Sequence, residues 1–140
     1  MAGASMYGRE QLLAAFFMPE LFDAPTDVFV ALCLSIPSSG DTGDDLAEPT
    51  DPVYVRQPYP IGSSYWGSTG RAGVTNTEEL SFGIPSEDWG VVVGWALCSH
   101  ETGGKTFYVG ELNNPVRVIY DAAVERPVIV GAEALVVKQT

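Results

Sequence analysis

The sequence predicts a mostly β fold, an antiparallel β-sandwich of the jelly-roll or Ig-like type with one N-terminal helix. Three observations indicate this class. Short runs rich in β-branched and aromatic residues recur along the chain, and turn residues separate them. A single stretch near the N-terminus has apolar residues at good helical spacing. Strands and helices do not alternate regularly, which argues against a parallel, doubly wound sheet.

The expected helix is MYGREQLLAAFFM, residues 6–18, within an N-terminal helix or arm that covers residues 1–25. Ser5 is placed to cap the start of the helix, and Pro19 ends it because proline cannot continue a helix interior. Two roles are open for its apolar face: burial against the main body, or exposure as an arm that docks on a partner. That face consists of Leu12, Leu13, Phe16 and Phe17.

Residues 26–140 are expected to form the β-sandwich domain. Turn signals at Thr102-Gly103-Gly104 and at Asn113-Asn114-Pro115 separate neighbouring strands, and the two glycines suit a tight hairpin. The strand-like runs are residues 28–35, 53–58, 79–82, 91–99, 106–112, 116–120 and 132–138.

Two long loops interrupt these runs. Residues 36–52 hold five carboxylates, but their spacing does not match an EF-hand, so a solvated acidic loop is favoured over a calcium site. Residues 59–76 mix glycine and serine with aromatic side chains and match neither common glycine-rich nucleotide-binding motif. A loop of this length often makes contacts. Its aromatic residues are Tyr59, Tyr65 and Trp66.

The densest pattern is SEDWGVVVGWALCSHETGGKTFYVGEL, residues 86–112, which predicts a structural hairpin. Trp89 and Trp95 are expected to be buried, because large aromatic side chains contribute most by burial. Strand alternation places two sets of side chains on opposite faces. The first set is Val91, Val93, Trp95 and Leu97. The second set has smaller side chains and consists of Val92, Gly94, Ala96 and Cys98.

The sequence does not indicate an enzyme. His100 is the only histidine, it is expected at the surface, and no nucleophile motif surrounds a serine. Cys33 and Cys98 lie in apolar runs and are expected to be buried thiols, with a disulfide between them left open. No Cys/His cluster indicates a metal site, and no cofactor is expected.

The net charge of the chain limits the classes of partner that it can bind. Asp and Glu outnumber Lys and Arg by 18 to 7, which gives a net charge of −11. This charge opposes direct binding to nucleic acid and to an anionic membrane surface. The sequence shows no signal-peptide pattern and no apolar run long enough to cross a membrane, so synthesis and assembly in a cytoplasm are expected.

Several motifs resemble a family of small virion proteins of tailed bacteriophages, described variously as minor capsid, head decoration or tail proteins. The similar segments are EQLLAAFF, VYVRQPY, DWGVVVGWALCSHETGGKTFYVGELNNP and VIVGAEALVVKQT, and the resemblance covers nearly the whole chain. It implies that Trp89 closes one end of the sandwich and that Gly90 permits the turn into the next strand. The family pattern contains no active site.

The function expected from this resemblance is structural. The chain would be a capsid decoration protein in the virion, assembled in the host cytoplasm as a homotrimer that binds the major capsid protein. The alternatives are a tail or neck structural protein, or a carbohydrate-binding sandwich that displays Tyr65 and Trp66. The residues expected to contact partners are Leu12, Leu13, Phe16, Phe17, Tyr59, Tyr65 and Trp66.

Overall fold

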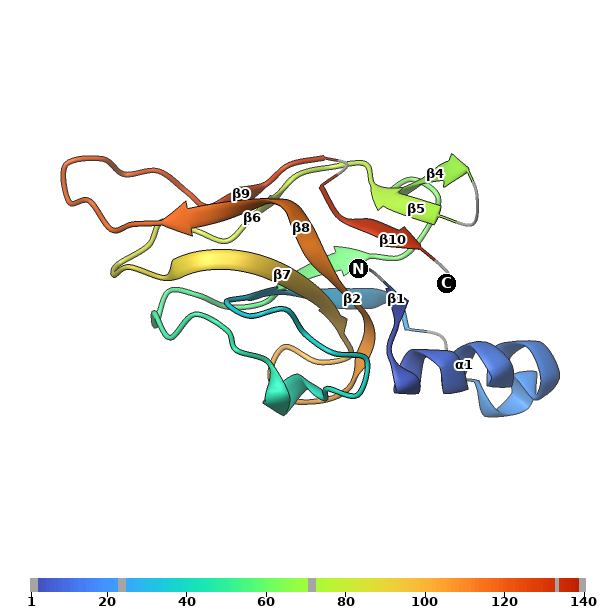
Figure 1. Cartoon of the computed structure of the whole chain (residues 1–140). Coiled ribbons are helices and arrows are strands. Elements are labelled where there is room, and N and C mark those ends of the chain that lie inside the picture. Colours follow the sequence, from blue (N-terminus) through green and yellow to red (C-terminus); the bar gives the residue numbers. More distant parts are fainter. Residues whose placement is uncertain (1–2, 23–24, 71–72, 133, 139–140) are drawn as a thin grey trace.

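A computed structural model describes residues 3–22, 25–70, 73–132 and 134–138. Its centre is a five-stranded sheet of order β1-β8-β7-β2-β3 (Figure 1). All strand pairs among the described residues are antiparallel, so the predicted mostly β, antiparallel fold is confirmed. The strands of this sheet are β1 (Gly3–Ala4), β2 (Asp27–Cys33), β3 (Gln57–Pro60), β7 (Gly90–Cys98) and β8 (Thr106–Val118).

Two smaller sheets pack over one face of the central sheet. One has the order β10-β5-β4, and the other pairs β6 with β9 (Figure 1). Their strands are β4 (Trp66–Gly70), β5 (Gly73–Asn76), β6 (Leu80–Ser81), β9 (Ile129–Val130) and β10 (Val136–Lys138). The helix α1 (Met6–Phe17) is followed by a short 3-10 turn, η1 (Pro19–Leu21), and a second turn, η2 (Gly43–Asp45), lies in the acidic loop.

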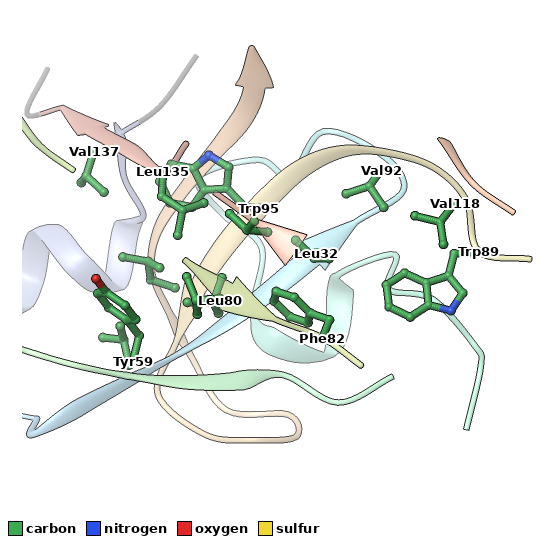
Figure 2. Packing of buried hydrophobic residues seen from close by; sticks show 14 residues of the cluster. Leu32, Tyr59, Leu80, Phe82, Trp89, Val92, Trp95, Val118, Leu135 and Val137 are labelled. Carbon is green, nitrogen blue, oxygen red and sulfur yellow. The ribbon is translucent and has the colours of Figure 1, made fainter. Parts of the chain in front are cut away.

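The main hydrophobic core lies between these sheets. Leu32 from β2 and Trp95 from β7 meet Leu80 and Leu135 from the smaller layer (Figure 2). Trp89 lies at one end of this cluster, with Tyr59 and Val137 at the other (Figure 2). Trp89 is 4% exposed and Trp95 is 1% exposed, which confirms the expected burial of both tryptophans.

Three predicted strand boundaries are wrong. The run 53–58 pairs only from Gln57 onward, as part of edge strand β3, where proline is tolerated. The expected turn at Asn113-Asn114-Pro115 lies inside β8. This strand bulges there, as its register with β7 shows: Gly94 pairs with Glu111, whereas Val92 pairs with Val116. The expected strand 132–138 reduces to β10, and β9 lies before it.

The bulge also changes the face that residues at the start of β7 occupy. Val92 joins Trp95 and Leu97 in the main core, although simple alternation places it on the other face. Val91 is exposed. The alternation holds beyond the bulge, where the small residues Ala96 and Cys98 face away from the main core.

The second face of the sheet is covered by the acidic loop. Leu46 of this loop packs on a small cluster from the sheet, formed by Ala31, Cys33, Ala96, Cys98 and Val109. Both cysteines are buried free thiols, and Cys98 pairs across the ladder with Phe29, not with Cys33. Burial raises the pKa of Cys33 to about 12 and that of Cys98 to about 11.

Candidate functional site

Helix α1 is attached to the sheet through its first turn. Ser5 caps it as expected, accepting a hydrogen bond from the Gly8 amide over 2.9 Å. Strand β1 pairs with β8 immediately before the helix, and Gly8 is the buried residue of α1. A side chain at position 8 would collide with the Phe107 carbonyl oxygen, so glycine allows this close approach. The ring of Tyr7 also contacts Phe107, with 5.5 Å between ring centroids.

The rest of the helix and the turn after it expose apolar side chains. Phe16 is 80% exposed, Phe17 is 69% exposed and Leu13 is 59% exposed, so burial against the main body is wrong for these residues. We call the exposed set the α1 patch. It consists of Met6, Leu12, Leu13, Phe16, Phe17, Met18 and Leu21.

An apolar hollow of about 420 Å³, which we call the α1 groove, lies between α1 and the strands next to it. It brings together Leu12 and Trp66, two predicted contact residues from distant parts of the sequence. None of its lining residues carries a charge. They are Gly8, Gln11, Leu12, Phe22, Pro25, Val28, Ile61, Trp66, Val74, Leu97, Phe107, Tyr108 and Val137.

Tyr59, the remaining predicted contact residue of this loop, does not belong to this surface. Its side chain is 4% exposed, because the ring packs edge-on against Tyr65 and Trp66 inside the core. Its hydroxyl donates to the Tyr65 carbonyl oxygen over 2.6 Å. Tyr65 and Trp66 are half-buried, and the indole N–H of Trp66 donates to the Pro60 carbonyl oxygen over 3.0 Å. Tyr59 therefore supports these two rings from below.

A buried arginine joins the acidic loop to the β7–β8 hairpin. Arg56 is 3% exposed, and its guanidinium binds both carboxylate oxygens of Glu48, over 2.8 and 2.9 Å. It also donates to three backbone carbonyl oxygens, those of Gly43, His100 and Gly103, over 2.8 to 2.9 Å. We call these five hydrogen bonds the Arg56 latch. Sequence reasoning assigned Arg56 to a strand and missed this role.

Asp51 makes a second buried polar connection. Its carboxylate accepts hydrogen bonds from the Trp89 indole over 2.9 Å, from the Val53 amide over 2.9 Å and from the Ser86 hydroxyl and amide. Burial alone would raise the pKa of Asp51, but these hydrogen bonds outweigh it and hold the pKa well below its usual range. The interpretation of a freely solvated loop is therefore wrong for Asp51 and Glu48.

His100 and Cys98, the two groups considered for catalysis, do not form a shared site. His100 is exposed, and its Nδ1 lies 2.7 Å from the hydroxyl of its neighbour Ser99. Cys98 is buried, and its raised pKa keeps the thiol protonated at neutral pH. Across the described residues, no group of three or more His, Cys, Asp or Glu side chains could hold a metal ion.

Comparison with known proteins places the chain in a phage family. Residues 3–125 match the family described as podophage GP4 fiber I protein gp80, and the chain belongs to this family. It is therefore a structural protein of a tailed-phage virion. No curated protein matches the chain. No helix in the described ranges is long and apolar enough to span a membrane.

Proposed function

We propose that the chain, as a member of the gp80 fiber family, is a structural subunit of the fiber apparatus of a podophage, joined to its neighbours through the α1 patch and the α1 groove. The observation that carries this proposal is the exposed apolar surface of α1. Monomeric proteins rarely expose a contiguous apolar patch above a few hundred Å², and larger patches mark interaction sites. The family description supports the fiber location.

The distribution of charge supports the same surface. The chain has a net charge of −11, yet no residue that lines the α1 groove is charged. The centre of a protein interface is typically depleted of charged residues, whereas the surrounding rim stays polar and hydrated. The uncharged groove therefore suits contact with a neighbour, and the acidic remainder suits exposure to solvent.

Capsid decoration is the second candidate. The net charge of −11 suits an outer position, remote from packaged DNA, and a small sandwich bound to the major capsid protein as a trimer would reinforce the shell. The fiber description of the family favours the first candidate. In both locations the proposed role is structural and involves no chemical step. Sugar binding is less favoured, because the polar N–H of Trp66 is already bonded to Pro60.

The location test is a cryo-electron microscopy reconstruction of the phage particle. We expect a density for this 15.0 kDa chain in the fibers. A phage that carries Phe16→Glu and Phe17→Glu should assemble heads but lack this density, and Ile119→Glu serves as the matched control because Ile119 is exposed outside the α1 patch. Density over the capsomers of the head would replace the fiber proposal with capsid decoration.

A further inference from the structure

We propose that the molecule has a second binding site, separate from the α1 surface, which takes a short neutral saccharide. The site is a hollow between residues 84–85 and the segment 119–126, which follows β8, and we call it the distal hollow. Figure 1 shows this segment at the end of the molecule opposite α1. The inference goes beyond the proposed function, because it assigns a ligand to an end of the chain that the α1 patch does not occupy.

The distal hollow is a preformed site of small-ligand size. Its volume is about 310 Å³, near the lower limit of the roughly 300–1,000 Å³ that is typical of such sites. On one wall, Ser86 donates from its amide and its hydroxyl to the buried carboxylate of Asp51. On the other wall, the Tyr120 amide donates to the Asp88 carboxylate over 2.6 Å. Since both walls are ordered in the free chain, binding loses little conformational entropy.

The hollow offers an exposed aromatic ring with aliphatic side chains around it. Tyr120 is 47% exposed, and Ile84 and Val124 are 44% and 43% exposed. A sugar ring is amphipathic, because its C–H groups form apolar faces and its hydroxyl groups project around the edge. Tyrosine presents a large apolar ring together with a polar hydroxyl, so it suits contact with both parts of a sugar.

Two charged side chains of the hollow can bind hydroxyl groups. In the described parts of the chain, the Arg126 guanidinium has no ion pair or hydrogen bond. One carboxylate oxygen of Asp121 accepts a hydrogen bond from the Ala123 amide over 2.9 Å, and the other has no partner among the described residues. A hydroxyl group both donates and accepts, so a sugar can donate to Asp121 and accept from Arg126. Such charge-assisted hydrogen bonds are about twice as strong as neutral ones.

The charge of the lining favours a neutral ligand. Arg126 and Asp121 are the charged residues of the hollow, and their charges cancel. A carboxylate ligand would pair with Arg126 but oppose Asp121 and a chain of net charge −11, and a cationic ligand would oppose Arg126. An apolar protein segment would bury both charges without partners, which is costly. A neutral ligand rich in hydroxyl groups can bond to both.

The distal hollow differs in this respect from the surface around Trp66. Trp66 lines the α1 groove, and its indole N–H is already bonded to Pro60, so sugar binding is not favoured there. Ile119 also borders the distal hollow, at the end of the molecule opposite α1 (Figure 1). Ile119→Glu therefore still serves as a control for contacts through the α1 surface.

The test is a titration of the purified full-length chain with methyl glycosides, followed by NMR. The probes are methyl glycosides of neutral hexoses, deoxyhexoses and N-acetylhexosamines, with glucuronic acid and glucosamine as charged comparisons. One or more of the neutral probes should bind with a Kd on the order of 1 mM. Tyr120→Ala and Arg126→Met should each weaken this binding about tenfold, because they remove the ring contact and the charge-assisted hydrogen bonds.

Two controls are matched to these variants. Tyr120→Phe keeps the ring and should bind within about threefold of the wild type. Arg117→Met removes an exposed arginine of β8 that does not line the hollow, and it should leave binding unchanged. All the substituted side chains are exposed, so each variant should fold, and circular dichroism checks this.

The inference would be overturned if no neutral probe bound at roughly ten times the expected Kd, or if the charged probes alone bound. Binding that neither Tyr120→Ala nor Arg126→Met weakens would also overturn it. The titration uses the isolated chain, so its result does not depend on the place of the chain in the virion. A chain that is found in the fibers but binds no neutral probe would refute the saccharide site and leave the proposed function in place.

Discussion

Replacing Arg56 with methionine should strongly destabilise the fold, although Arg56 lies outside the main hydrophobic core. The guanidinium is 3% exposed and makes five hydrogen bonds that join the acidic loop to the β7–β8 hairpin. Methionine fills a similar volume but donates none of these five hydrogen bonds. The variant would leave the Glu48 carboxylate without its cation and three carbonyl oxygens without these donors.

The size of the effect follows from this loss. Removing one partner of a buried ion pair costs about 3–5 kcal/mol. Unfolding entropy is about 2.1 cal/mol/K per residue, or about 0.3 kcal/mol/K for a chain of 140 residues. A loss of about 4 kcal/mol should therefore lower Tm by about 13 °C. Arg56→Lys keeps the charge but cannot bind both oxygens of Glu48 in the same planar geometry, so its loss should be smaller.

The assay is urea unfolding at neutral pH, followed by the fluorescence of the buried tryptophans. Arg56→Met should lower the midpoint without a large change in the slope, which is the sign of a change in stability alone. Arg117→Met is the matched control, because Arg117 is exposed on β8 and its replacement should change stability by no more than about 0.5 kcal/mol. If Arg56→Met behaved like this control, the Arg56 latch would not stabilise the fold.

Two further predictions concern the core and the acidic loop. Trp95→Ala should cost about 3–5 kcal/mol in the same urea assay, because Trp95 is 1% exposed and its removal empties a large core site. For Asp51, the pKa is lower in the folded chain than in the unfolded chain. Its stabilising contribution should be complete above about pH 4 and decline as the pH falls towards the folded pKa. Asp51→Asn should remove this part of the acid dependence, and identical pH profiles for the two proteins would contradict the assignment.

The features that sequence reasoning predicted correctly depend on local patterns. The helix follows from apolar spacing, its start from Ser5, and the β7–β8 turn from Gly103 and Gly104, both with positive φ. Gly90, with φ of +96°, supplies the turn into β7 that the family resemblance implied. Each of these depends on a few consecutive residues, which is the range over which propensity and periodicity are informative.

The features that sequence reasoning missed depend on distant residues. Arg56 binds the carbonyl oxygens of residues 44 and 47 positions further along the chain, and no local pattern encodes these contacts. The bulge in β8 contains proline and two asparagines, residues that ordinarily indicate a turn. The β4–β5 hairpin was not predicted, because its glycine-rich sequence has low strand propensity.

Only part of the candidate site could be predicted from the sequence, for the same reason. The apolar residues of α1 could be identified from their spacing, and Trp66 from its place in a long loop. The groove could not be identified, because Val74 and Val137 come together only when β5 pairs with β10, and Ile61 reaches them from the end of β3 in the central sheet. Tyr59 was assigned to the surface because its neighbours in the sequence resemble a loop, whereas pairing of β3 with β2 turns its ring inward.

The residues that stabilise the fold are separate from the residues that we propose for assembly. The core is built from strands around Trp95, and the acidic loop is fixed to it through Arg56 and Asp51. Helix α1 is joined to this body through β1 and Gly8, and its most exposed large apolar residues, Phe16 and Phe17, contribute little to the single chain. Exposed apolar side chains on α1 are therefore not required by the fold. Their presence on an otherwise strongly acidic protein is what the contacts proposed above would explain.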